Sequence, residues 1–318
     1  MALLASPKLA LKRGALLTAA NWQVVVLQWV ADSVFTALLA VPVVGGAALV
    51  VLTSGLAPQD LFDQGLARAV PAVAAALLAH PIALAAFLAA MFVVLLGGSL
   101  FMAFVKGGTI AVLALAEQEA GPVEHPPLQL QAVSHTGRFR LETATAGAQR
   151  LFGRFARLGC GLFVAYGAIG ALSLTTIVSL GTPESAWDGA RIFGVTLTVI
   201  VAYTVVNLLY LLMQIAVAVD DCDAGTGVAR TLTFLVRRPR DVGIVFGVVS
   251  TLVALGTAAS FLATAALGLI AFVPFVGLAA LPLQVGAWMV RGLVFQFLGL
   301  TALVAYLRLY REGGGTGA

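Results

Sequence analysis

The sequence predicts an all-α, polytopic membrane bundle of six transmembrane helices in three hairpins, with amphipathic elbow helices on the cytoplasmic side. Of its 318 residues, 61% are apolar and 10% are charged, whereas soluble proteins are about 45–50% apolar and about 25% charged. The mean hydropathy is +1.03. One core inside a polar shell cannot give this value, because residues that face water have to be polar. The sequence lacks the short alternating segments of a spanning β-barrel, so helices are the expected spanning elements.

Six apolar runs reach the ~20 residues that a spanning helix needs. They lie within residues 24–56, 82–115, 158–180, 192–219, 242–272 and 276–306. We expect a single membrane domain over residues 1–318. It is made of a cytoplasmic amphipathic segment (1–20), three hairpins (22–115, 158–219 and 242–310), two cytoplasmic links (116–157 and 220–241) and a flexible tail (311–318).

Prolines and glycines predict interruptions of two of these runs. Pro42, followed three residues later by a Gly-Gly pair, predicts a break in the first run, and Pro282 predicts one in the last. A short re-entrant piece over residues 272–282 is an alternative there. Between the first two runs, apolar residues at helical spacing predict a helix over residues 59–79 on the outer surface.

Basic residues are distributed asymmetrically along the chain. Fourteen of the eighteen lie on the side that carries both termini: Lys8, Lys12, Arg13, Arg138, Arg140, Arg150, Arg154, Arg157, Arg230, Arg237, Arg238, Arg240, Arg308 and Arg311. Arg68 and Arg191 lie on the other side, and Lys106 and Arg291 fall inside apolar runs. Because lysine and arginine accumulate in cytoplasmic loops, we expect both termini in the cytoplasm.

A short amphipathic segment precedes each hairpin, at about 8–20, 146–157 and 226–238. The basic residues of such segments contact anionic lipid headgroups, each contributing about 1 kcal/mol. The residues expected to do so here are Lys8, Lys12, Arg13, Arg150, Arg154, Arg157, Arg230, Arg237 and Arg238. A role limited to anchoring the topology is the simpler alternative.

Three ionisable residues, Asp32, Lys106 and Arg291, lie within the apolar runs. Charges at membrane depth are costly and are usually paired or functional. Counted along a helix from Val276, Arg291 lies about 22 Å in, toward the inner leaflet. An ion pair between Asp32 and Arg291 is therefore geometrically possible, with Lys106 as a competitor near the same level, and it fails if residues 272–282 are re-entrant. Snorkelling of the two cations is a structural alternative, and solute transport is a functional one.

Uncharged polar groups mark one face of the fourth run. Asn207, Tyr210 and Gln214 follow an i, i+3, i+7 spacing, so they share a helix face. Hydrogen bonding to neighbouring helices is the favoured interpretation, and the lining of a cavity is the alternative. Gly243 and Gly247 form a GxxxG motif, which indicates close contact with another helix of the bundle or of a partner.

Asp220, Asp221 and Asp223 form an acidic cluster between the fourth run and the third elbow. We favour capping of the elbow helix and ion pairing with Arg230 or Arg237. Binding of a divalent cation through the carboxylate oxygens is the alternative.

Sequence motifs for catalysis and cofactor binding are absent. The sequence has no GxxxxGK[ST], HExxH or GxSxG motif, and its three histidines are isolated from one another. Neither cysteine belongs to a CxxC pair. We therefore expect no enzymatic activity, no cofactor and no metal. The composition also excludes a nucleic-acid-binding domain.

The stretch from the fourth run into the third elbow reads MQIAVAVDDCDAGTGVARTLTFLVRRPRDVG. It resembles a signature of poorly characterised bacterial six-helix inner-membrane proteins, of the YciC-like and glycerophosphodiester phosphodiesterase membrane-domain type. There an apolar helix ends in an acidic residue, followed by a glycine and an amphipathic Ala-Arg-Ser helix. Asp220 and Asp221 match the acidic place, Gly225 and Gly227 the glycine place, and Ala229-Arg230-Thr231 the start of the amphipathic helix, with aspartate for glutamate and threonine for serine. The resemblance implies the fold and a multi-pass location in the bacterial inner membrane, and it implies no chemistry.

These observations together favour a non-catalytic integral inner-membrane protein that acts as a scaffold or accessory subunit of a membrane complex. Its expected partners are anionic membrane lipids and either another membrane protein or further copies of the chain. The alternative is a transporter or channel-like carrier of a small solute or lipid, using the three intramembrane charges.

Overall fold

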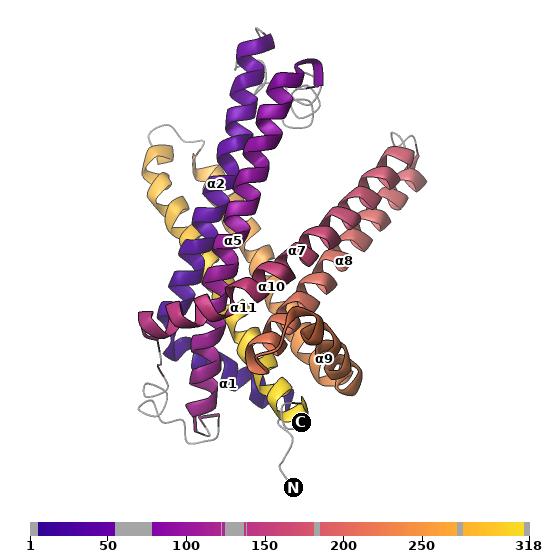
Figure 1. Ribbon diagram of the computed structural model, residues 1–318. Coiled ribbons are helices and arrows are strands. Elements are labelled where there is room, and N and C mark those ends of the chain that lie inside the picture. The colour runs from indigo at the N-terminus through magenta and orange to yellow at the C-terminus, as the bar shows by residue number, and fades with distance from the viewer. Residues whose placement is uncertain are drawn as a thin grey trace. The chain divides into compact units, whose positions relative to one another are not determined.

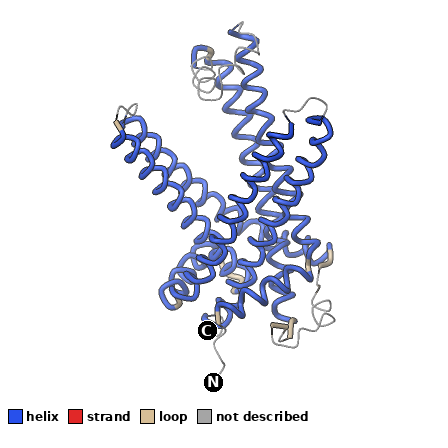
Figure 2. Tube along the Cα trace, turned by 180° about the vertical axis from the view of Figure 1, so that it is seen from behind, coloured by secondary structure: helices blue, strands red, loops and turns tan. Residues whose placement is uncertain are grey.

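The computed structural model describes residues 6–54, 78–121, 123–124, 137, 139–180, 185–271 and 276–314. All regular structure in these ranges is helical (Figure 2). The helices are α1 (Pro7–Ala20), α2 (Trp22–Ser54), α5 (Pro81–Glu119), α7 (Leu141–Leu180), α8 (Ala186–Val219), α9 (Ala224–Arg237), α10 (Pro239–Ala271) and α11 (Val276–Gly314). Six of them, all but α1 and α9, are long and apolar enough to cross a membrane. The predicted all-α membrane class is confirmed.

The chain forms two compact units. One consists of residues 30–102, and the other, called the core unit here, consists of residues 1–29 and 103–318. Helices α2 and α5 each contribute residues to both units. In the 30–102 unit the two helices pack through aromatic rings set against glycines: Phe35 against Gly98 and Phe87 against Gly46. The predicted outer helix at 59–79 lies almost wholly outside the described residues.

Two predicted interruptions are not found. Helix α2 continues through Pro42, and α11 runs unbroken from Val276 through Pro282. Spanning helices tolerate an internal proline where the freed backbone groups are satisfied locally. A continuous α11 leaves no re-entrant turn at 276–282, while residues 272–275 lie outside the described ranges.

The core unit is packed at one end of its helices. Helices α7 and α8 form one hairpin and α10 and α11 another, and α1 packs along the last turns of α11 (Figure 1). Most buried residues fall within five stretches, which we call the packed end: residues 10–25, 103–117, 144–158, 212–218 and 300–310. Beyond it, none of the described residues of α7 from 159 onward or of α8 before 212 is buried.

Two of the three predicted elbows are separate helices. Helix α1 ends at Ala20, and the side-chain amide of Asn21, its C-cap, donates to the carbonyl oxygen of Leu17 at 2.9 Å. Helix α9 ends before Pro239, because a residue that precedes proline disfavours the helical conformation. The second elbow differs: residues 146–157 are continuous with the membrane-spanning part of α7, and no helix-breaking residue separates the two.

Glycines bring helix backbones of the packed end into contact. A Cβ atom on Gly14 of α1 would lie 2.4 Å from the carbonyl oxygen of Thr301 in α11. A Cβ atom on Gly108 of α5 would lie 2.7 Å from the carbonyl oxygen of Ala144 in α7. Small residues at helix contacts are the usual basis of packing in membranes, where lipid tails compete with apolar side chains.

We predict that Gly14→Ala lowers the thermal stability of the detergent-solubilised protein, by about 1–3 kcal/mol, because the added methyl group overlaps backbone atoms of α11. Gly299→Ala is the matched control, since no atom lies within 4 Å of its added Cβ. The melting temperatures of the two variants should separate in a thermal scan. Equal melting temperatures would show that α1 does not pack on α11 as described.

Candidate functional site

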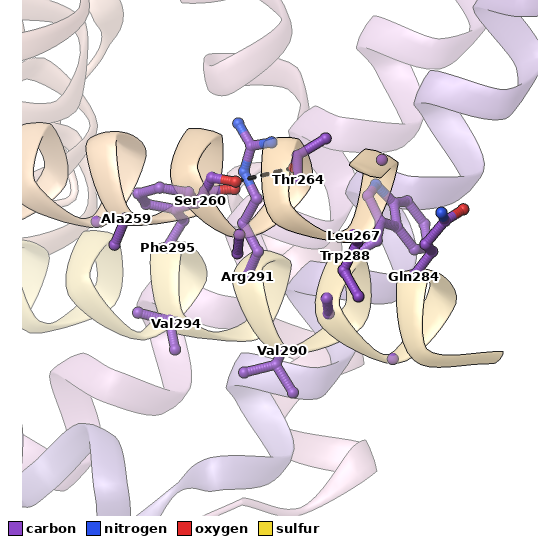
Figure 3. A pocket seen from close by; sticks show the side chains of 15 residues that line it. Ala259, Ser260, Thr264, Leu267, Gln284, Trp288, Val290, Arg291, Val294 and Phe295 are labelled. Atoms are coloured by element: carbon purple, nitrogen blue, oxygen red, sulfur yellow. Dashed lines mark hydrogen bonds between the residues drawn. The ribbon is translucent and has the colours of Figure 1, made fainter. Parts of the chain in front are cut away.

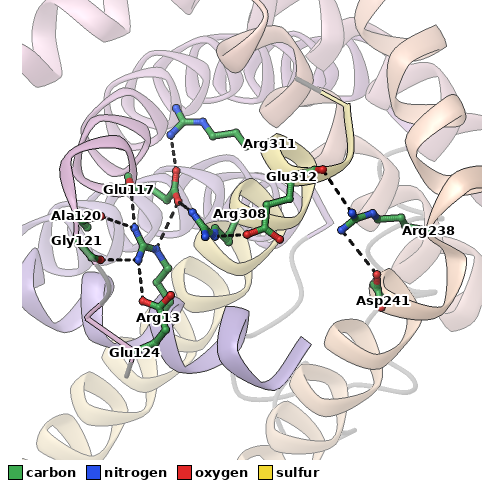
Figure 4. Close-up of polar contacts among 10 residues, drawn as sticks. All are labelled: Arg13, Glu117, Ala120, Gly121, Glu124, Arg238, Asp241, Arg308, Arg311 and Glu312. Atoms are coloured by element: carbon green, nitrogen blue, oxygen red, sulfur yellow. Dashed lines mark hydrogen bonds and ion pairs between the residues drawn. The ribbon is translucent and has the colours of Figure 1, made fainter. Parts of the chain in front are cut away.

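The carboxylate of Glu117, in the last turn of α5, is the centre of a buried ion network. Its side chain is 2% exposed. The two carboxylate oxygens contact the guanidinium groups of Arg13 on α1 (3.5 Å), Arg308 on α11 (3.4 Å) and Arg311 on α11 (Figure 4). One carboxylate therefore joins three helices that are far apart in the sequence.

Arg13 also closes the C-terminal end of α5. Its guanidinium donates to the carbonyl oxygens of Glu117 (3.1 Å), Ala120 (2.9 Å) and Gly121 (2.8 Å), and to the carboxylate of Glu124 (2.8 Å). The last carbonyls of a helix have no backbone partner within it, and a cation there also interacts favourably with the helix dipole. Arg13 thus acts as a helix cap supplied by another helix.

A second branch of the network connects α11 to the start of α10. Nε of Arg308 lies 2.7 Å from the carboxylate of Glu312. The backbone carbonyl of Glu312 accepts a hydrogen bond from Arg238 at 3.4 Å, and Arg238 lies 3.9 Å from Asp241 (Figure 4). Charges of alternating sign therefore run from α5 to α10 across the packed end.

Glu124 follows α5 and is 7% exposed. Burial alone would raise its pKa. Hydrogen bonds from its own backbone N–H and from Arg13 outweigh burial and hold the pKa below the ordinary value of 4.5. Glu124 is therefore a carboxylate that Arg13 keeps charged.

The N-terminus of α9 is capped as the sequence predicts. The Asp223 carboxylate accepts the backbone N–H of Thr226 at 3.3 Å, and hydrogen bonding with Thr226 lowers the pKa of Asp223. The preceding Asp221 has a φ of 49°, a left-handed conformation that turns the chain out of α8 and that aspartate tolerates better than most residues.

The other two aspartates of the cluster form ion pairs. Asp220 lies 2.6 Å from Arg230 and accepts a hydrogen bond from the Tyr310 hydroxyl at 2.6 Å. Asp221 lies 2.5 Å from Arg154. The prediction of capping and pairing is confirmed, with Arg230 as the partner of Asp220. All three carboxylates are engaged by groups of the chain.

The predicted headgroup-binding residues divide into two groups. Arg13 is buried and bonded to protein groups, Lys12 donates to the carbonyl oxygen of Glu124 at 2.7 Å, and Arg154, Arg230 and Arg238 pair with aspartates. The side chains of four others are exposed on the surface: Lys8, Arg150, Arg157 and Arg237. For these four a headgroup contact stays a prediction.

The three intramembrane charges have different surroundings. The Lys106 ammonium lies 5.4 Å from the centroid of the Tyr210 ring on α8. Asp32 is exposed within the 30–102 unit, and Arg291 belongs to the core unit, with its guanidinium 5.6 Å from the centroid of the Phe295 ring. The pairing of Asp32 with Arg291 therefore stays a prediction.

The polar face of α8 contacts neighbouring helices. The Asn207 side-chain oxygen accepts a hydrogen bond from Tyr166 of α7 at 2.5 Å, and Tyr210 lies against Lys106 of α5. Gln214 is 2% exposed and its amide nitrogen has no hydrogen-bond partner within the described structure. Two of the three residues thus have the interhelical contacts that the packing interpretation predicts.

A groove of about 820 Å³ lies between α10 and α11. Small residues of α10 form one wall, and Trp288, Arg291 and Phe295 of α11 form the other (Figure 3). The described residues that line the groove include one ionisable side chain, that of Arg291. One of the three predicted intramembrane charges, Arg291, therefore lies in a groove lined mainly by apolar and small residues.

The sequence analysis does not predict the ion network, because nothing in the sequence alone marks Glu117 or Glu124 as buried. Glu117 follows an apolar run directly, at a membrane edge where basic residues predominate. Arg308 and Arg311 are three residues apart, so they share a helix face. An acidic residue such as Glu117, at the end of an apolar run and on the side where basic residues accumulate, indicates an ion pair. The sequence does not show which arginines it contacts, because that depends on how the helices pack.

No protein-family model, no curated protein and no solved structure matches this chain. Its function therefore has to be argued from its own residues.

We predict that Glu117→Gln destabilises the protein by about 3–5 kcal/mol, because it leaves buried guanidinium groups without their carboxylate. Glu142→Gln, at an exposed position in the first turn of α7, is the control. Chemical or thermal unfolding in a mild detergent measures both. A loss no larger than that of the control would contradict the role of Glu117.

We predict that acid weakens the packed end through Glu124. Since its pKa in the folded protein is lowered, its contribution to stability is complete above pH 4.5 and is lost as the pH falls through the lower folded value. Melting temperatures of the native chain and of Glu124→Gln, recorded from neutral pH downward, should converge in acid. Parallel curves would contradict this assignment.

Proposed function

We propose that this chain is a non-catalytic integral protein of the bacterial inner membrane that serves as a scaffold or accessory subunit of a membrane complex. Its termini and packed end lie in or near the cytoplasm in this proposal. The proposal depends on a contrast within the core unit. Charges are paired at the packed end, whereas elsewhere no described residue covers the apolar faces of the helices.

The uncovered faces carry large apolar side chains. Phe193 and Ile200 of α8 are 70% and 57% exposed, and Leu255 and Phe261 of α10 are 63% and 70% exposed. Lipid can cover such faces. A partner helix covers them equally well if its backbone can approach closely, which requires small residues.

The GxxxG motif of α10 supplies such a surface. No atom of the described chain lies within 4 Å of a Cβ added at Gly243 or Gly247. Among the described residues, no neighbouring helix therefore approaches this motif closely. The open motif therefore supports contact with another chain.

The location rests on the basic residues and on the resemblance to YciC-like proteins. The helix order at the acidic cluster, in which α8 ends at Val219 and the capped helix α9 leads into α10, supports that resemblance. The lack of sequence motifs for catalysis supports a non-catalytic role. Anionic lipids at the cytoplasmic face are proposed ligands of the exposed basic residues.

A carrier of a small solute or lipid is the second candidate function. The observation that favours it is the groove between α10 and α11, because an intramembrane cation lines it. Transport would require Arg291, and also Asp32 if the two residues form a pair. Arg291→Gln and Asp32→Asn would then abolish uptake of the solute. Unchanged uptake with reduced expression would support a structural pair.

The scaffold proposal predicts a stoichiometric partner after gentle native extraction, identified by mass spectrometry of all chains that co-purify. Replacing Gly243 and Gly247 together by leucine should remove the partner, because the added side chains block close approach. Gly167→Leu, at an open position on α7, is the control. Purification as a single chain without a partner or further copies would overturn the proposal.

A further inference from the structure

We propose that the groove between α10 and α11 binds an anionic phospholipid of the surrounding bilayer, with its phosphate at Arg291 and an acyl chain along α10. The scaffold role does not depend on this site. The carrier role would use the same groove, and it would require the bound ligand to be released as well.

The shape of the groove suits an acyl chain. Its volume of about 820 Å³ lies within the usual range of ligand pockets, about 300–1,000 Å³. Beside Leu267 and Gly268, the wall on α10 is made of small side chains at a spacing of three and four residues: Gly256, Ala259, Ser260, Ala263 and Thr264. Such a stripe normally lets two helices approach closely. Here Trp288 and Phe295 of α11 stand opposite, and open space remains between the helices.

The positive charge of Arg291 in the groove favours an anionic ligand. Figure 3 shows the Arg291 side chain extending from α11 toward Ser260 and Thr264 of α10. No aspartate or glutamate is among the described residues that line the groove. A guanidinium within a membrane is costly unless a counter-charge or polar groups compensate it. A phosphate group satisfies the requirement because guanidinium donates two parallel hydrogen bonds to it.

The depth of Arg291 fits a lipid headgroup. Arg308 belongs to the ion network at the packed end, and it follows Arg291 by seventeen positions in the same helix, a rise of about 25 Å. The hydrocarbon core is about 30 Å thick. Arg291 therefore approaches the membrane surface opposite the packed end, where phosphate groups lie.

This position differs from the one expected from the sequence. Counting about 22 Å from Val276 places Arg291 toward the inner leaflet. Helix α11 has 39 residues and is therefore about 58 Å long, much longer than the hydrocarbon core is thick. The network at Arg308 fixes the helix at its other end. With the packed end on the cytoplasmic side, the bound phospholipid comes from the outer leaflet.

Trp288 lines the groove and reports on its occupant. We would replace the other three tryptophans, Trp22, Trp29 and Trp187, by phenylalanine and place the full chain in phosphatidylcholine bilayers. Phosphatidylglycerol with brominated acyl chains, which quench tryptophan fluorescence on contact, is then added and compared with equally brominated phosphatidylcholine. Near-ultraviolet circular dichroism verifies that each variant is folded.

We expect brominated phosphatidylglycerol to occupy the groove with about fivefold preference over brominated phosphatidylcholine, the factor for one basic residue acting on an anionic lipid. Arg291→Gln should reduce the preference to about one, while Arg291→Lys, which keeps the charge, should retain most of it. Arg191→Gln, which removes an exposed cation from α8, is the matched control and should leave the preference unchanged.

Three results would overturn the proposal. Equal quenching by both lipids in the native chain would show that the groove does not select an anion. An absence of quenching would show that protein, such as a partner helix, fills the groove in place of lipid. The third result is quenching of Trp288 by a brominated fatty acid in the presence of an equal concentration of unbrominated phosphatidylglycerol. It would show that a free carboxylate, and not a phospholipid, is the ligand.

Discussion

The burial of one carboxylate governs how the core unit is assembled. Glu117 is 2% exposed, and a charge removed from water costs several kcal/mol unless it is paired with good geometry. Its partners, Arg13, Arg308 and Arg311, come from α1 and α11. The first and last described helices are thus held against α5. The amphipathic N-terminal segment is therefore an integral part of the fold, although its sequence is typical of a peripheral anchor.

Packing is concentrated where it has a driving force. Lipid tails are as apolar as leucine, so helices in the bilayer gain little from hiding apolar side chains from lipid. Close contacts at the packed end depend on backbone approach at Gly14 and Gly108 and on the ion network. Elsewhere α8 and α10 keep large apolar side chains on their surfaces. A scaffold can use such surfaces for other chains, and the groove beside Arg291 suits the lipid itself.

The candidate sites were predictable only in part. Arg291 was identified from its position in an apolar run, and the capping role of Asp223 followed from its position before an amphipathic helix. Glu117 was missed because a single acidic residue at the end of a run resembles any helix terminus. Arg13 was expected to contact lipid headgroups, since its helix has a basic face, and the structure instead directs it to the carbonyl oxygens at the end of α5.

The helical membrane class, six helices of spanning length and the elements at the acidic cluster all follow from the amino-acid sequence alone. These depend on composition and on local signals such as an aspartate cap or a proline at a helix start. Three features become visible only once the helices are packed: α7 includes the second elbow, α11 continues through Pro282, and Arg13, Arg308 and Arg311 share Glu117. Helix continuity and charge pairing depend on which neighbours satisfy freed backbone groups and buried charges. Residues far apart in the sequence supply those neighbours.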